Sequence, residues 1–452
     1  MDRVIDQFSS YAEALSYADL SPSAIHATKH RVIDSLGCVL GAYLEEPCKM
    51  ARRMCLPVDS AFSARVIGSL LRTAPDSAAF ANGLMGRYLD FNDSIRIVGV
   101  GHPSDSVPAM LAIGEACHVS GKSLITAITL AYEAIIQFIE AFAYDYKGWD
   151  QPTFLTLGIA LGAGKILGLN KEQFANVMGI ATVANITLQQ NRAGEISMWK
   201  AGAAGNAGRQ GIFAALLARE GITGPQEAFE GKFGYFNQVT GPLKVELKGG
   251  KGNLFAVERP NMKNYPVRDS CQLVIMTALE LRKKISPDKI QSLRVKIYGS
   301  AYRTAVALSP NLWAPKTRET ADHSIPFCIV AALLDGDVTP ETFRKKRYLD
   351  SDVVNLLGQM KCEEDPEFSK QTPAIRNCYI EATTHSGEKV VAHSIFKQEE
   401  LEKGWTDEQV EAKYMKLAQT ILTPKQARAC LDLIWKLGDV DDTARIIDNL
   451  RA

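Results

Sequence analysis

The side chains best suited to acid–base chemistry lie in a polar stretch between two apolar, alanine-rich segments, within residues 83–109, GLMGRYLDFNDSIRIVGVGHPSDSVPA. They are Asp90, Asn92, Asp93, Ser94 and His102. Polar groups buried between apolar helices cost free energy unless they are hydrogen-bonded or used. The intrinsic pKa of histidine is near neutrality, which makes His102 the candidate general acid/base. Asp90 would orient His102 or serve as its partner base.

A capped loop is the alternative interpretation of this stretch. Aspartate and serine often begin helices, and proline stops them. Asp93 fits both interpretations, as a second partner of His102 or as a helix cap. Residue types alone leave the two interpretations open.

Two later segments, 153–169 and 201–220, are dense in glycine and alanine. Glycine costs about 1 kcal/mol per helix position relative to alanine, so we expect these helices to approach their neighbours very closely. Gln151 precedes the first helix and Lys200 the second. Helix N-termini attract anions, so the two ends together with Lys200 would suit a carboxylate ligand.

Further cations flank the dipeptide Tyr265-Pro266. They are Lys263 and Arg268. Arg268 could bind a carboxylate with two parallel hydrogen bonds. The alternatives are that Arg268 forms a surface ion pair and that Lys200 only extends along a helix end.

The other histidines are weaker candidates. His26 and His30 are four residues apart on a predicted helix, but no acid or third ligand lies nearby in sequence, so a solvated helix face is favoured over a metal site. His323 lies between Asp322 and Ser324, which resemble helix-start residues, so His323 is not included in the predicted site.

Composition excludes several classes of protein. Lys+Arg and Asp+Glu both number 51, so the chain lacks the basic excess that nucleic acid or an anionic membrane would require. The nine cysteines are odd in number, scattered and without a CxxC motif, which favours reduced thiols and a cytoplasmic location. The N-terminus has no signal-peptide pattern, and the longest apolar run, 124–144, contains Glu133 and Glu140.

The order of expected elements indicates an insertion. Helical patterns fill the chain up to about residue 240 and return after residue 398. Between them we expect a strand within 292–305, a buried helix over 323–334 and a β-hairpin over 376–394 turning at Ser386-Gly387. The predicted fold is mainly α, with a large all-helical domain built from both chain ends and a smaller inserted α+β domain. We place the first at 1–260 and 398–452 and the second at 261–397.

Several motifs resemble the MmgE/PrpD family over nearly the whole chain. They are DSLGCVLGA, LDFND followed by GHPSD, AGKILGL, GEISMWKAGAAGNAGRQGIFAALLAREGITGPQEAFEG, KNYP and ADHSIPFCIVAALLDGDVTPETF. The resemblance implies that the α+β domain is a lid, that the active site lies in the cleft beneath it, that the protein is a homodimer, and that neither a metal nor an organic cofactor is used.

The resemblance also assigns residues. The family's motif acid falls on Asp90, its hydroxyl on Ser94, its histidine on His102 and its two lysines on Lys200 and Lys263. Some members have a histidine where this chain has Gln151, and others have one where it has Arg268, Asp269 and Ser270. The predicted catalytic residues are therefore His102, Asp90 and Lys200, and the predicted substrate-binding residues are Asp93, Ser94, Gln151, Lys263 and Arg268.

The resemblance implies a cofactor-independent lyase acting on a small di- or tricarboxylate, in the first place a hydro-lyase like 2-methylcitrate dehydratase. The alternatives within the family are cis-aconitate decarboxylation and epimerisation of a dicarboxylate. An inactive carboxylate-binding protein is the alternative from another class.

Overall fold

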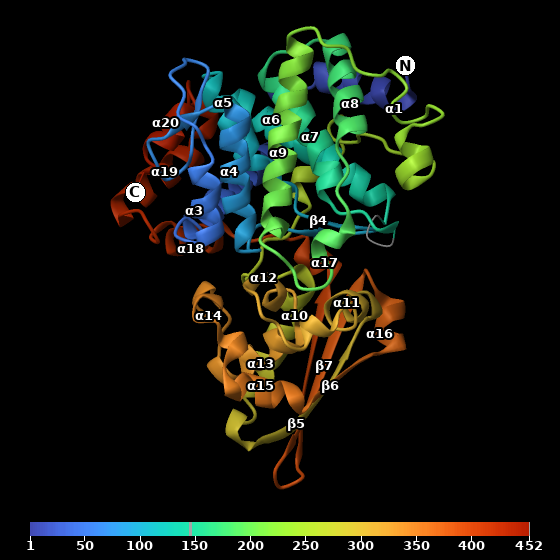
Figure 1. The fold of residues 1–452 in the computed structure, drawn as a ribbon, viewed down its shortest axis with the longest axis vertical. Helices are drawn as coiled ribbons and strands as arrows, with labels where there is room; N and C mark the ends of the chain where they lie inside the picture. Colours follow the sequence, from blue (N-terminus) through green and yellow to red (C-terminus); the bar gives the residue numbers. More distant parts are fainter. Residues whose placement is uncertain (144–146, 452) are drawn as a thin grey trace. The chain divides into compact units, whose positions relative to one another are not determined.

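The computed structural model describes residues 1–143 and 147–451. The chain is mainly helical, as predicted, and its contacts divide it into two compact units (Figure 1). Unit 1 comprises residues 1–189, 201–262 and 405–452, and unit 2 comprises 190–200 and 263–404. Compared with the expected boundaries, residues 190–200 and 398–404 group with unit 2, and residues 261–262 group with unit 1.

Unit 1 is built from helices whose apolar faces form one core. They are α1 (Arg3–Ala14), α2 (Pro22–Gly41), α3 (Glu46–Arg53), α4 (Pro75–Tyr88), α5 (Val107–Ala116), α6 (Gly121–Ala141), α7 (Pro152–Ile166), α8 (Lys171–Ala184), α9 (Trp199–Arg219, which starts in unit 2), α18 (Asp407–Ala418), α19 (Pro424–Trp435) and α20 (Ala444–Asp448). The described part of the unit also contains two pairs of two-residue strands, β1–β2 (Ala64–Arg65 and Arg72–Thr73) and β3–β4 (Ile95–Arg96 and Val100–Gly101).

Local sequence signals explain where these helices begin. Ser21 caps α2 by accepting a hydrogen bond from the Ala24 N–H (3.1 Å), and Pro22 occupies the first helical position. The apolar run noted over residues 124–144 lies mostly in α6, which begins at Gly121 and ends at Ala141; Tyr144 lies outside the described residues. α6 is long and apolar enough to cross a membrane, but 89% of its apolar stretch is buried inside the protein, which is typical of a core helix.

The small-residue helices pack closely, as expected from their composition. A Cβ added at Gly83 of α4 would lie 3.0 Å from the Cα of Gly205 in α9. A Cβ at Gly211 of α9 would lie 2.6 Å from Cγ2 of Ile159 in α7. Glycine lets these backbones approach to distances that a methyl group would prevent.

Unit 2 is an α+β unit around a four-stranded sheet in the order β6-β5-β7-β8. Its strands are β5 (Ile290–Ile297), β6 (Met360–Glu364), β7 (Ile375–Thr384) and β8 (Lys389–Lys397). Its helices are α10 (Asp269–Arg282), α11 (Gly299–Ala305), α12 (Arg318–Ala321), α13 (Ile325–Asp335), α14 (Pro340–Arg344), α15 (Ser351–Gly358), α16 (Pro366–Gln371) and α17 (Gln398–Leu401).

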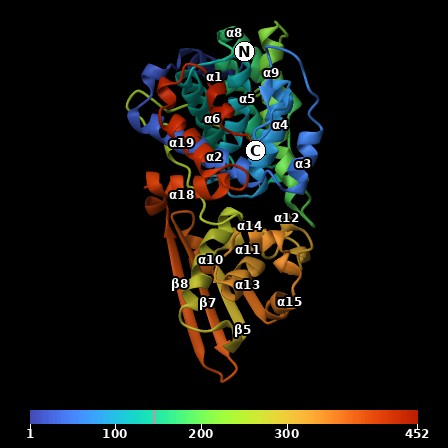
Figure 2. The same cartoon turned by 90° about the vertical axis from the view of Figure 1, so that its left-hand side faces the viewer.

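The core of unit 2 lies between the sheet and two helices. α10 packs on β7 and β8, and α13 packs on α10 (Figure 2). β7 and β8 form the predicted hairpin, whose turn contains Gly387 at φ +83°, where glycine is favoured. β6 was not predicted; it pairs in parallel with β5, with Val295 opposite Cys362.

Candidate active site

Asp93 is fully buried in unit 1 and hydrogen-bonded on both carboxylate oxygens. Tyr132 Oη donates to Oδ2 (2.9 Å), and the Ser104 hydroxyl donates to Oδ1 (2.5 Å). The guanidinium of Arg31 is 3.9 Å from Oδ2. Burial raises the pKa of Asp93, and Arg31, Ser104 and Tyr132 act against this rise. Asp93 therefore acts as a structural centre of the polar stretch.

A hydrogen bond on the ring and another on the main chain hold His102 in place. Nδ1 lies 2.6 Å from the main-chain oxygen of Asp93, which is an acceptor only, so Nδ1 carries the proton in this hydrogen bond. In the neutral ring Nε2 is then the basic nitrogen. The group that orients the ring through Nδ1 is thus a carbonyl and not the Asp90 carboxylate.

Gln151 links His102 to a second buried acid. Its Oε1 accepts from the His102 N–H (2.6 Å), and its Nε2 donates to Oδ2 of Asp105 (2.9 Å). Asn92 Nδ2 donates to Oδ1 of Asp105 (2.8 Å) and to the Ser104 hydroxyl (2.9 Å). The side-chain amide of Gln151 is engaged on both atoms, which is the arrangement of a residue that positions His102.

Asp90 belongs to the same set of buried groups through Arg87. Nη1 of Arg87 is 2.8 Å from Oδ1 of Asp90, and its Nε is 3.7 Å from Oδ2 of Asp105. Asp90 has φ +51°, a left-handed conformation that aspartate adopts more readily than most residues. Ser94 is fixed by its main chain, which exchanges hydrogen bonds with that of Asn261 (2.8 and 2.7 Å).

Lys200 lies in unit 2 and is completely buried. Its Nζ is 2.8 Å from each carboxylate oxygen of Asp322. The Arg318 guanidinium (2.8 Å) and His323 Nδ1 (2.6 Å) contact the same carboxylate. Burial by itself would raise the pKa of Asp322, but Lys200, Arg318 and His323 together lower it. Lys200 is therefore no solvated helix end.

The other two predicted cations also belong to unit 2. Arg268 donates from Nη1 to the Thr304 carbonyl (2.9 Å) and from Nη2 to its hydroxyl (3.1 Å). The main-chain N–H of Arg268 donates to the Asp322 carbonyl (3.1 Å), so Arg268 lies next to the residue whose carboxylate pairs with Lys200. Lys263 is buried at the start of the KNYP turn, and Gln272 Oε1 accepts from the N–H groups of Asn264 and Tyr265 that follow it.

The predicted residues therefore fall into two sets, one in each unit. Asp90, Asp93, Ser94, His102 and Gln151 belong to unit 1. Lys200, Lys263 and Arg268 belong to unit 2. Sequence reasoning missed that Asp322 and His323 are buried beside Lys200, because the residue types around His323 resemble a helix start. Arg318, four residues before Asp322, was the available signal, since residues at that spacing meet on one helix face.

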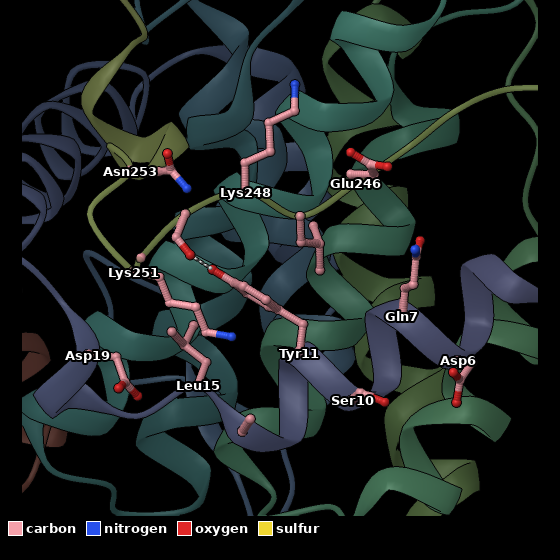
Figure 3. A pocket seen from close by; sticks show the side chains of 14 residues that line it. Asp6, Gln7, Ser10, Tyr11, Leu15, Asp19, Glu246, Lys248, Lys251 and Asn253 are labelled. Carbon is pink, nitrogen blue, oxygen red and sulfur yellow. Dashed lines mark hydrogen bonds between the residues drawn. The ribbon is translucent and has the colours of Figure 1, made fainter.

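A separate pocket of about 950 Å³ lies in unit 1 beside α1 (Figure 3). It is lined by side chains of α1 and of the segment 246–253, and Tyr11 Oη donates to the Gly249 carbonyl across it (3.0 Å). Buried Glu133 holds that segment by accepting from the N–H groups of Lys248 and Gly249 (both 2.9 Å). The pocket contains none of the predicted catalytic or binding residues.

Comparison with known proteins identifies the family. Human cis-aconitate decarboxylase is 25% identical over 451 residues, covering 97% of this chain and 92% of that protein. The 2-methylcitrate dehydratases of Cupriavidus necator and Escherichia coli K12 are each 26% identical, covering 78% and 81% of this chain and 76% and 79% of their own lengths. Residues 6–248 match the MmgE/PrpD N-terminal domain and residues 265–438 match the C-terminal domain. The chain belongs to the MmgE/PrpD family.

Proposed function

We propose that this protein is a cofactor-independent lyase that acts on a small di- or tricarboxylate, in the first place as a hydro-lyase like 2-methylcitrate dehydratase. Relatives named for dehydration and for decarboxylation support the lyase class. The observation that carries the proposal is the fixed tautomer of His102, whose Nδ1 donates to the Asp93 carbonyl and leaves Nε2 as the basic atom.

In the proposed reaction, Nε2 of His102 removes a proton from a carbon next to a substrate carboxylate. The hydroxyl on the neighbouring carbon leaves as water with the proton that Nε2 then carries, which returns His102 to its neutral form, and a C=C bond forms. The negative charge that builds up on the carboxylate in the transition state must meet cations or hydrogen-bond donors. We assign this role to Lys263 and Arg268, and Lys200 with Asp322 would support them as a buried ion pair.

The remaining site residues have positioning or binding roles in this proposal. Gln151 and Asp93 hold His102 through hydrogen bonds, and Asp90 keeps Arg87 in place beside Asp105. The Ser94 hydroxyl binds the substrate. A lid function of unit 2 and a homodimer are parts of the same proposal.

The alternatives within the family differ in the bond that breaks. A decarboxylase acting on cis-aconitate would break a C–C bond, release CO2 and return a proton to the carbon. An epimerase would remove a proton and return one to the opposite face. Each reaction includes a proton transfer at carbon in which His102 can take part, as a base or as a proton donor, so the geometry of His102 alone does not separate them.

Incubation with 2-methylcitrate, citrate and cis-aconitate distinguishes the reactions. A rise in alkene absorbance identifies a dehydratase, and CO2 release identifies a decarboxylase. If none of the three reacts, a dicarboxylate epimerase assay follows. Binding of these acids without any turnover would favour the inactive carboxylate-binding protein.

His102→Ala tests the assignment of the base. We expect turnover to fall by at least about 100-fold, because a positioned general base typically contributes that much. His118→Ala is the matched control, since His118 is an exposed histidine of unit 1 that pairs with Asp442 (2.8 Å). Survival of most of the activity in His102→Ala would refute the assignment.

A further inference from the structure

Three potential metal ligands meet on the surface of unit 1, where α2 and α18 pack together. Nε2 of His30 is 2.7 Å and Nε2 of His26 is 2.9 Å from the same atom, Oδ1 of Asp407. The two imidazoles belong to α2, four residues apart, and Asp407 is the first residue of α18. The sequence alone did not indicate an acid that would meet His26 and His30. In the folded protein Asp407, from the C-terminal part of the chain, supplies the carboxylate.

The backbone that carries these ligands is held firmly. A Cβ at Gly37 of α2 would lie 3.3 Å from Cα of Tyr414 in α18, so the two helices are in close contact. One turn from the histidines, buried Lys413 of α18 pairs with Asp34 of α2 (2.7 Å). The ligands therefore project from two helices whose separation is fixed by packing, which is the preorganisation that a metal site needs.

The imidazole rings are also held by a neighbour. Trp435 stacks on His26 with ring centroids 5.4 Å apart and contacts His30 edge-on at 5.6 Å. A neutral imidazole, with a lone pair on Nε2, is the form that binds metal. The side chains of His26 and Asp407 are 50% and 49% exposed, so an ion could enter from solvent and keep a water molecule.

We propose that His26, His30 and Asp407 form a site for a divalent transition metal of the Zn²⁺ class. Two imidazole nitrogens and one carboxylate oxygen are a common ligand set for Zn²⁺, with solvent completing a tetrahedron. Ligand atoms of a tetrahedral zinc ion lie about 3.3 Å apart, so each nitrogen–oxygen distance would open by roughly half an ångström. The ion would replace the protons on Nε2 of His26 and Nε2 of His30. In each ring that proton would move to Nδ1 of the same ring or be released to solvent.

The site would join the first and last parts of unit 1. α2 lies near the N-terminus, and α18 begins the segment that returns to the unit after unit 2. Because the metal binds only when both helices are in place, its binding free energy adds to the stability of the folded state. This role is independent of the proposed lyase reaction, since none of the three ligands belongs to the candidate active site.

The test uses the full-length, tag-free protein under reducing conditions. We expect one Zn²⁺ per chain, a higher melting temperature with Zn²⁺, and with Co²⁺ a tetrahedral visible spectrum without a thiolate charge-transfer band. Co²⁺ should also quench tryptophan fluorescence, and the quenching should be smaller in Trp435→Phe.

His30→Ala and Asp407→Ala should each weaken Zn²⁺ binding by at least about tenfold. Replacing a residue that only supports a metal ligand typically lowers the metal affinity by that much, so loss of a ligand itself should cost no less. His26→Ala serves as the second ligand variant that should fold, because half of its side chain is exposed. His118→Ala should bind like the wild type, because it removes an exposed His–Asp pair that has the same chemistry. The proposal is wrong if the wild type binds no Zn²⁺ at micromolar concentration, or if folded ligand variants bind as the wild type does.

Discussion

At the residue scale, Gln151 is the side chain on which the placement of His102 depends. Gln151→Leu would remove the acceptor of the buried His102 N–H and one of the donors to the Asp105 carboxylate, a loss that typically costs about 1–3 kcal/mol for each buried group. We expect kcat to fall by about 10- to 100-fold, as when a catalytic group is misplaced, with a smaller change in KM. Steady-state kinetics on the substrate found by the assay above measure the two separately.

The control for this variant is Gln173→Leu, which removes a glutamine at the start of α8. Its kinetics should match the wild type. Equal kcat values for Gln151→Leu and the wild type would show that Gln151 does not position the base.

The Lys200–Asp322 pair makes a prediction about stability. Lys200→Met leaves the Asp322 carboxylate buried with one cation fewer, and breaking a buried pair on one side typically costs about 3–5 kcal/mol. Lys200→Met/Asp322→Leu removes both charges of this pair and should recover part of the loss, but only part, because Arg318 and His323 also contact the Asp322 carboxylate. Thermal unfolding followed by circular dichroism compares the variants, and a double variant as unstable as Lys200→Met would contradict the explanation.

The same pair predicts a dependence on pH. The folded protein holds the pKa of Asp322 below its ordinary 3.8. The stabilisation is therefore complete above that ordinary value and is lost as the pH falls toward the lower, folded-state pKa. On acidification below the ordinary value, the wild type should lose more stability than Lys200→Met/Asp322→Leu; parallel melting curves for the two would exclude this contribution.

At the element scale, the close contact of α4 and α9 depends on Gly205. A Cβ there would lie 3.0 Å from the main-chain nitrogen of Leu84, and backbone moves less easily than a side chain. Gly205→Ala should therefore destabilise by about 1–3 kcal/mol, although alanine favours helix. Asn206→Ala, on the next residue of α9, is the control and should be close to neutral; the measurement is the melting temperature.

The elements that the sequence predicted well have a strong local signal. The 376–394 hairpin and the glycine-rich helices each follow from neighbouring residues, and the structure confirms them. β6 has the sequence MKCEE, which is short and mostly polar, and it is a strand because β5 offers it an edge. Its pairing is a tertiary effect that no local pattern carries.

The candidate site divides in the same way. The sequence pointed to His102, Lys200 and Lys263 because their motifs are distinctive, and all three are buried. It could not show that a carbonyl orients His102, because every residue has a main-chain carbonyl and the sequence does not indicate which one accepts a hydrogen bond. It also could not join Lys200 to Asp322 or His30 to Asp407, because each pair is formed only by folding.

At the scale of the whole molecule, we expect a homodimer. Apolar side chains on unit 1 support this expectation, since Val183, Leu188 and Phe213 are 59%, 57% and 49% exposed and a second copy could cover such surface. Light scattering after size-exclusion chromatography should give twice the mass of the chain. A monomer at micromolar concentration would refute the expectation.

The three-segment composition of unit 1 has a consequence for synthesis on the ribosome. Tyr414 and Leu417 come from the final segment and complete the core against Gly37 and Gly41 of α2. During translation, the face of α2 that contains Gly37 and Gly41 therefore stays exposed until nearly the whole chain has been synthesised. Every residue of unit 2 precedes this last segment of unit 1. Unit 2 can therefore fold before unit 1 has all the residues of its core.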